Sequence, residues 1–149
     1  MQLNVKTFDE LTNKELYNIL KLRSEVFVVE QKCNYVDMDD IDINSLHVFF
    51  SDDDKILAYL RTFMLDGEDN TAKIGRVISS QRRSGIGSKL LKEGKIAAKS
   101  ILGAKKLIVD AQSYVKSFYE KSGFVQVSEE FLEVNIPHVK MELKLYKMV

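Results

Sequence analysis

The sequence predicts an α/β protein built on a mixed, mostly antiparallel sheet. The expected elements run β-α-β-β-β-α-β-α-β-β, so three successive antiparallel strands are followed by two strand–helix crossovers. The length of 149 residues is typical of one domain, and 45% apolar with 30% charged residues is an ordinary globular composition. Because the single proline, Pro137, leaves no Pro-rich linker, we expect one domain over residues 1–149.

The first half begins with a weakly alternating strand at residues 2–8. Thr12 and Glu15 have the spacing of a capping box, in which the two side chains satisfy free amides at a helix start. Apolar residues at helical spacing follow, so we expect a helix that ends near Glu30 with one face toward a core. Residues 31–45, rich in Asp and Asn, predict a loop with room for a short helical turn.

A hairpin follows this loop. Two apolar-rich runs at residues 46–50 and 55–64 are joined by Ser51-Asp52-Asp53-Asp54, which is typical of a hairpin connection. Residues 72–79 predict another strand after a turn at residues 66–70. These three strands form the expected antiparallel meander.

The second half alternates between helices and strands. A polar loop leads to a helix at residues 86–102, in which Gly94 costs about 1 kcal/mol against Ala and Gly103 is suited to the helix end. A buried strand at 107–111 precedes a short helix at 113–121. Two final strands are expected at 124–127 and 139–145, with Pro137 and His138 in the loop before the last one.

Composition limits the partners that we expect. Lys and Arg together number 22, as do Asp and Glu, so no global basic field favours nucleic acid or an anionic membrane as a partner. The single cysteine, Cys33, excludes an internal disulfide and fits a reducing compartment. The N-terminus lacks a basic region followed by a long apolar run, and about 18 consecutive apolar residues occur nowhere. We therefore expect a cytoplasmic protein, either a monomer or a homodimer.

Residues 74–91 form the strongest functional segment. They predict a strand, a polar loop with two glycines, and an amphipathic helix. Amides at such a helix start point outward and add to the positive end of the helix dipole, while Gly85 and Gly87 let the backbone approach a phosphate. Arg82 and Arg83 can add charge-assisted contacts. The segment lacks the Walker A and full dinucleotide patterns, and by itself it fits a tight structural turn equally well.

Residues 111–124 form the second segment of interest. The aromatic pair Phe118 and Tyr119 lies in a short expected helix. In isolation such a pair indicates core packing more than catalysis.

Together, the two segments resemble a known family. Arg82-Arg83-Ser84-Gly85-Ile86-Gly87 resembles the Gln/Arg-x-x-Gly-x-Gly/Ala signature of the GNAT N-acetyltransferases. Phe118-Tyr119-Glu120-Lys121-Ser122-Gly123-Phe124 is similar to that family's Leu-Tyr-Glu-Lys-Leu-Gly-Phe segment, in the same order along the chain. Residues 22–35 and 136–141 resemble the ElaA-like subgroup. The resemblance covers residues 10–145.

This resemblance implies a fold, a reaction and a set of residues. The GNAT fold implies a sheet of about seven strands flanked by about four helices, and a direct transfer from acetyl-CoA to an amine in a ternary complex. The Val77 backbone amide would stabilise the developing oxyanion, and Tyr119 would act as the general acid for the leaving thiolate. The residues implied in acetyl-CoA binding are Val77, Ile78, Ser79, Arg82, Arg83, Ser84, Gly85, Ile86, Gly87, Ser88, Gln112 and Tyr119. The loop before Gly85 is shorter than usual, and Arg83 replaces a usual glycine.

The base that would deprotonate the amine is left open by the sequence. Its candidates are Glu30, Asp39, His47 and His138, or water alone. The run of Asp37, Asp39, Asp40 and Asp42 has the default interpretation of a solvated loop. Its functional interpretation is an acidic rim that attracts a cationic amine. Cys33 is expected to be inert, and no set of residues has metal-ligand spacing.

Two other functions remain open from the sequence. Residues 23–27 also resemble the first segment of acyl-homoserine-lactone synthases, which use longer acyl donors, although this chain contains no tryptophan. A non-catalytic CoA-binding interaction protein is the third possibility. The acceptor amine, a small molecule or a peptide, is not identified by any motif.

Overall fold

A mixed sheet forms the centre of the molecule. The computed structural model describes residues 1–31, 36–79 and 85–145, without the side chains of residues 29 and 30. Within this part the sheet has eight strands in the order β1-β2-β3-β4-β5-β8-β6, and β7 pairs with β8. The strands are β1 Gln2–Thr7, β2 Leu46–Asp52, β3 Lys55–Met64, β4 Thr71–Ser79, β5 Lys106–Gln112, β6 Val125–Gln126, β7 Phe131–Glu133 and β8 Ile136–Lys144. All neighbours are antiparallel except β4 and β5, which confirms the expected mixed sheet.

The first helix starts at the predicted capping box. The Thr12 hydroxyl accepts a hydrogen bond from the Glu15 amide (3.0 Å), and the Glu15 carboxylate accepts one from the Thr12 amide (2.9 Å). Helix α1, Asn13–Arg23, continues directly into a π-helix, Ser24–Glu30. The predicted single helix is therefore two segments, and the wider second one carries its side chains to the cavity described below.

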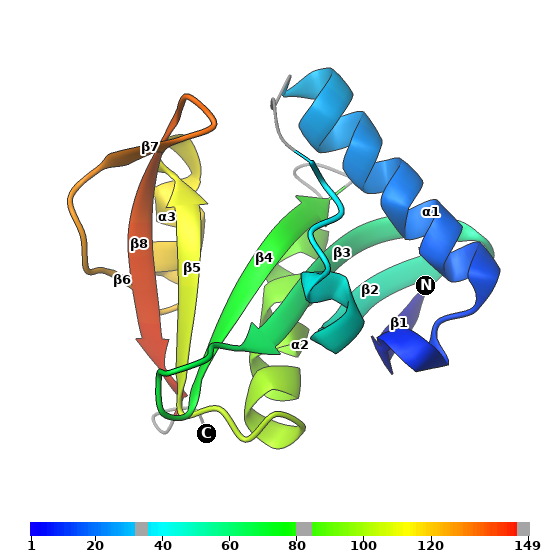
Figure 1. Cartoon of the computed structure of the whole chain (residues 1–149), viewed down its shortest axis with the longest axis horizontal. Coiled ribbons are helices and arrows are strands. Elements are labelled where there is room, and N and C mark those ends of the chain that lie inside the picture. Colours follow the sequence, from blue (N-terminus) through cyan, green and yellow to red (C-terminus); the bar gives the residue numbers. More distant parts are fainter. Residues whose placement is uncertain (32–35, 80–84, 146–149) are drawn as a thin grey trace.

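Helices α1 and α2 pack on opposite faces of the sheet (Figure 1). Two successive residues of β3 show why. Tyr59 packs with Ile19 of α1 in one cluster, whereas Leu60 packs with Leu90 of α2 in the main core on the other face. Helix α2 is Ile86–Ser100, and the short α3 is Lys116–Lys121. After α2, Gly103 has φ +72° and the Ala104 amide bonds to the Ala98 carbonyl oxygen, as predicted for this helix end.

Strands β4 and β5 diverge along their length. They pair only from Thr71 to Ile74 on β4, opposite Lys106 to Val109 on β5. In Figure 1 the two strands lie close at the lower end and separate toward the upper end. The second half of β4 thus has no strand partner on its β5 side.

The C-terminal region differs from its prediction. Strand β8 begins at Ile136, so Pro137 and His138 lie in the strand and not in a preceding loop. Pro137 is tolerated because it lies at the start of the strand, opposite Leu132 of the three-residue β7. The short β7 itself was not predicted.

The helix count is also lower than expected. Three α-helices occur in the described residues, compared with about four implied by the resemblance. The described part of residues 31–45 contains only a 3₁₀ turn, Ile41–Asn44, because neighbouring aspartates are bound by arginines from other elements. None of the helices in the described ranges has the length and apolar character needed to cross a membrane.

Candidate active site

A cavity of about 1070 Å³ lies where β4 and β5 separate. Its walls come from the π-helix, β3, β4, β5, the start of α2, α3 and the β7–β8 hairpin. Residues from both faces of the sheet line it, because the divergence of the two strands opens the sheet at this point. A space of this size holds a ligand larger than a typical small metabolite.

A bulge shapes the β4 wall of this cavity. Tyr59 pairs with Ile78 but Arg61 pairs with Gly75, so β4 carries one extra residue at this point. Arg76 has φ +52°, which is uncommon for a residue other than glycine, and Val77 follows it opposite no residue of β3 or β5. Val77, Ile78 and Ser79 all line the cavity.

The start of α2 forms a second wall. Gly85 precedes the helix with φ +80°, and Gly85, Gly87 and Ser88 line the cavity. The first amides of a helix have no carbonyl partner within it, so they are available to an anion. Ile86 instead packs in the core with 4% of its surface exposed. Arg82, Arg83 and Ser84 lie outside the described residues.

Tyr119 of α3 faces the cavity from a buried position. Its ring makes edge-to-face contacts with Phe118 (centroids 5.1 Å apart) and Phe124 (5.7 Å), so the aromatic pair belongs to the core as well as to the cavity wall. Burial raises the pKa of the Tyr119 hydroxyl above its ordinary value of 10.0. The hydroxyl therefore stays protonated at neutral pH.

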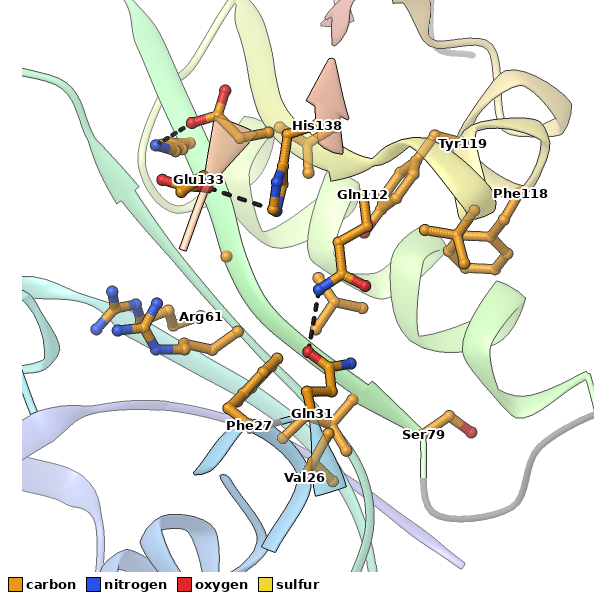
Figure 2. Close-up of a pocket in the computed structure, with 18 of the residues that line it drawn as sticks. Val26, Phe27, Gln31, Arg61, Ser79, Gln112, Phe118, Tyr119, Glu133 and His138 are labelled. Carbon is orange, nitrogen blue, oxygen red and sulfur yellow. Dashed lines mark hydrogen bonds and ion pairs between the residues drawn. The ribbon is translucent and has the colours of Figure 1, made fainter. Parts of the chain in front are cut away.

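His138 lies on β8 opposite Gln112 of β5 and lines the same cavity as Tyr119 (Figure 2). Its Nδ1 is 2.6 Å from the Ile136 carbonyl oxygen, and the Phe131 ring stacks on the imidazole with centroids 6.0 Å apart. Its Nε2 lies 3.5 Å from the Glu133 carboxylate. Only 6% of the His138 side chain is exposed.

Glu133 is a cavity residue that sequence reasoning missed. It ends β7, a strand of three residues, and its carboxylate reaches His138 from the neighbouring strand. A pattern of period two cannot be recognised in so short a segment. The sequence therefore offered no signal for it.

Charged side chains on β3, β4 and β5 line the same part of the cavity. Lys73 forms an ion pair with Asp110 (2.8 Å), and Arg61 forms one with Asp39 (2.7 Å). Within the described residues, the buried Asp110 Oδ1 and Arg61 Nε atoms have no hydrogen-bond partner.

Gln112 connects the two sides of the cavity. Its Nε2 donates a hydrogen bond to Oε1 of Gln31 at 3.0 Å, joining β5 to the end of the π-helix (Figure 2). The two residues are 81 positions apart, so no local pattern predicts the contact.

The aspartates of residues 37–42 divide into a covered pair, Asp37 and Asp42, and an exposed pair, Asp39 and Asp40. Asp42 accepts hydrogen bonds from Arg23 (2.7 Å) and Arg61 (2.9 Å). Asp37 accepts from Arg23 (3.0 Å) and also from Arg76 (2.9 Å). Both interpretations fail for Asp37 and Asp42, because these two carboxylates neutralise guanidinium groups instead of facing water. Asp40 is exposed.

Two of the other candidate bases, His47 and Asp39, are held by other groups of the protein. His47 is buried at 1% exposure, with Nε2 2.9 Å from the Asp42 carbonyl oxygen and Nδ1 2.7 Å from the Tyr59 hydroxyl. Burial lowers the pKa of its imidazole, so the ring is neutral. Asp39 lines the cavity but is bound to Arg61. Glu30 ends the π-helix with its side chain outside the description, and Cys33 also falls outside the described residues.

Across the described ranges, no group of three or more His, Cys, Asp or Glu residues is arranged to hold a metal ion.

Comparison with known proteins places this geometry in a family. A model described as an acetyltransferase (GNAT) domain matches residues 10–145. A UPF0039 protein of Schizosaccharomyces pombe is 38% identical over 144 residues, covering 94% of this chain and 95% of the relative. The protein ElaA of Escherichia coli is 35% identical over 136 residues, covering 89% of both.

Solved structures agree with the sequence relatives. The crystal structure of Escherichia coli ElaA matches with a TM-score of 0.88 at 32% identity, covering 95% of this chain and 97% of that one. An acyl-CoA N-acyltransferase from Pseudomonas aeruginosa also matches with a TM-score of 0.88, at 38% identity, covering 95% of this chain and 99% of that one.

Proposed function

Because the chain belongs to the GNAT acetyltransferase family, we propose that it transfers the acetyl group of acetyl-CoA to a primary amine. The amine attacks the thioester directly while both substrates are bound. The observation that carries this proposal is the cavity between β4 and β5, which combines the Val77 bulge, the open start of α2 and the buried hydroxyl-bearing Tyr119.

The donor would bind along β4 and at the start of α2. Backbone groups of Val77, Ile78 and Ser79 would hold the pantetheine arm, because the neighbouring strand has moved away from this edge. The pyrophosphate would lie against the amides of Gly85, Gly87 and Ser88, with Arg82, Arg83 and Ser84 beside them. Gln112 would reach the arm only by giving up its hydrogen bond to Gln31.

The chemistry needs an oxyanion donor, an acid and a base. The Val77 amide would donate to the oxygen on which charge develops, a contact worth about 2.7–4 kcal/mol in other enzymes. His138 would take one proton from the ammonium, so that the nitrogen can form the new C–N bond. As the C–S bond breaks, the Tyr119 hydroxyl would protonate the thiolate, and the second proton lost by nitrogen would restore the tyrosine through solvent. Positioning of both substrates would supply a further ~7–11 kcal/mol.

Two alternatives keep the fold and change the function. A longer acyl donor is one, since a solved relative is named only as an acyl-CoA N-acyltransferase. A non-catalytic CoA-binding protein is the other. Thermal unfolding with CoA, acetyl-CoA and longer acyl-CoAs separates them, because a ligand at 100 times its Kd adds ~2.7 kcal/mol of stability. Stabilisation by none of them would contradict all three CoA-based functions.

The direct test is acetyl-CoA turnover against a panel of amines, followed as free thiol. We expect amine-dependent release, and a fall in kcat of about 10²–10⁴-fold in Tyr119→Phe with little change in acetyl-CoA affinity. Tyr17→Phe is the matched control, because Tyr17 is exposed on α1 and lies away from the cavity. An unchanged kcat in Tyr119→Phe would remove this residue from the mechanism.

A further inference from the structure

A carboxylate and an imidazole face each other across the β7–β8 hairpin. Glu133 ends β7 and His138 lies near the start of β8, and both line the cavity (Figure 2). The Glu133 Oε2 and His138 Nε2 atoms are 3.5 Å apart. The Glu133 side chain is 52% exposed whereas that of His138 is 6% exposed, so the pair joins the open mouth of the cavity to its wall.

The partner of the other imidazole nitrogen fixes the ring's tautomer. His138 Nδ1 lies 2.6 Å from the Ile136 carbonyl oxygen, and a carbonyl oxygen can only accept a hydrogen bond. Nδ1 therefore carries the hydrogen, and Nε2 of the neutral ring presents a lone pair. When the ring is neutral, Nε2 and the ionised Glu133 carboxylate are two acceptors that one shared donor can bridge, and when the ring is protonated, Nε2 itself donates to the carboxylate.

Neighbouring lysine and arginine side chains do not supply a hydrogen-bond donor to the Glu133 carboxylate. Lys73 is held by Asp110 (2.8 Å), and Arg61 is held by Asp39 (2.7 Å) and Asp42 (2.9 Å). Among the ion pairs of the described residues, none joins a lysine or arginine to Glu133, whose neighbour of this kind is the His138 imidazole. The Glu133 carboxylate is thus available to a cation that enters the cavity.

We propose that Glu133 and His138 together bind the acceptor amine as its ammonium ion, and that Glu133 makes the site select cationic amines. This inference rests on the proposed function and names the acceptor class for that site. One N–H of the ammonium donates to Glu133 Oε2 and another donates to His138 Nε2. When the proton donated to His138 is transferred, that N–H bond breaks, an Nε2–H bond forms, and a neutral amine with its lone pair remains. The adjacent carboxylate then stabilises the imidazolium.

The surroundings of the pair suit an alkylammonium chain. Val26, Phe27, Ile41 and Phe63 line the same cavity with apolar surface. Phe131 stacks on the face of His138 with an interplanar angle of 24°, which limits rotation of the ring. A primary amine on an alkyl chain can therefore place its charge at the pair and its carbons on the apolar wall.

The chain contains only two histidines, so both imidazoles can be followed individually by nitrogen NMR. The probe is n-hexylammonium chloride added to the CoA-saturated protein, with 1-hexanol as its neutral counterpart. We expect hexylammonium to shift the His138 Nε2 resonance, hexanol to leave it in place, and the buried His47 to stay unchanged as an internal control. Glu133→Gln should weaken the response about fivefold, as loss of one partly exposed charge pair predicts. Glu129→Gln, an exposed neighbour outside the cavity, should not.

Kinetics separate this inference from the function on which it rests. With the best amine of the panel, Glu133→Gln should raise KM about fivefold, whereas His138→Gln should mainly lower kcat. If the wild type turned over acetyl-CoA with no amine of the panel, the transferase function would be overturned. The NMR titration would still test the ammonium site in that case. Turnover with an unchanged KM in Glu133→Gln, or an unmoved His138 resonance, would overturn the inference itself.

Discussion

Burial determines the acid–base behaviour of Tyr119. The residue is 5% exposed and is enclosed by two aromatic rings, so the phenolate form would lose its hydration without gaining a cationic partner. Its pKa is accordingly raised, with a smaller contribution from Tyr114. A tyrosine of this kind is suited to donate a proton and is poorly suited to act as a base.

The raised pKa of Tyr119 predicts the alkaline side of the pH profile. The Tyr119 hydroxyl stays protonated even at a pH equal to the ordinary tyrosine pKa of 10.0. Its ionisation should therefore cause no decline in kcat between about pH 8 and pH 10. The measurement is kcat at saturating acetyl-CoA and amine across that range. A falling limb below about pH 10 that disappears in Tyr119→Phe would contradict the prediction.

The two histidines show what sequence reasoning could and could not decide. Both were candidate bases, and the sequence favoured His138 only because we expected it in a loop after Pro137. The structure separates them by their partners: His47 has both nitrogens bound by buried groups, whereas His138 turns one nitrogen toward the cavity. The His47 partners, Tyr59 and Asp42, lie on other elements, so local patterns could not reveal them. The positive φ of Gly85 before α2, by contrast, depends on local backbone geometry, which a glycine at that position already indicated.

Among the elements, the β7–β8 hairpin has the most strained backbone near the cavity. Its two-residue turn consists of Val134 (φ +46°) and Asn135 (φ +61°), and positive φ at both positions is the geometry of a type I′ turn. Asparagine tolerates this conformation, but a β-branched valine does not. The two positive-φ residues lie directly beside Glu133 in the chain.

Replacing Val134 with asparagine should relieve this strain. We expect Val134→Asn to raise the free energy of unfolding by about 1 kcal/mol, measured by urea denaturation. Val127→Asn is the matched control, because Val127 is similarly exposed and lies outside the positive-φ positions. A Val134→Asn variant no more stable than the Val127→Asn variant would show that the turn is not strained.

The same hairpin explains which elements escaped prediction. The long amphipathic segments of α1 and α2 were found, since each carries a strong helical period and a recognisable end at Thr12 or Gly103. Strand β7 was missed because three residues carry no period and its turn lacks the usual Asn-Gly signal. The π-helical end of the first helix was also beyond reach, because one extra residue per turn leaves the apolar pattern almost unchanged.

At the scale of the whole molecule, three arginines and three aspartates join distant segments. Arg23 comes from α1, Arg61 from β3 and Arg76 from the β4 bulge, and all three bind carboxylates of residues 37–42. The side chains of Arg23 and Arg61 are only 1% and 3% exposed. Loss of a carboxylate partner would therefore leave a buried guanidinium charge that is neither paired nor hydrated. This network fixes the segment that precedes β2 against the cavity wall. The sequence showed the acidic residues but not their partners, which lie 14 to 39 positions away.

The network predicts how stability changes in acid. Burial alone would raise the pKa of Asp39, but hydrogen bonds from Arg61 and the charges of Arg61 and Arg76 lower it to about 2 from 3.8. A lowered folded-state pKa contributes stability that is fully present above the ordinary value and is lost as pH falls toward 2. The difference in Tm between the wild type and Asp39→Asn should therefore narrow as pH falls from about 4 to about 2.

The matched control for this measurement is Asp66→Asn, whose carboxylate is exposed in a turn. Its Tm difference from the wild type should stay small over the same range, because Asp66 lies exposed at the surface of a turn. If residues 1–149 form one domain, as we predict, each scan should also show a single cooperative transition. A constant gap for Asp39→Asn would mean that Arg61 is neutralised without this carboxylate. Two separate transitions would instead mean that the network does not link the halves of the chain into one unit.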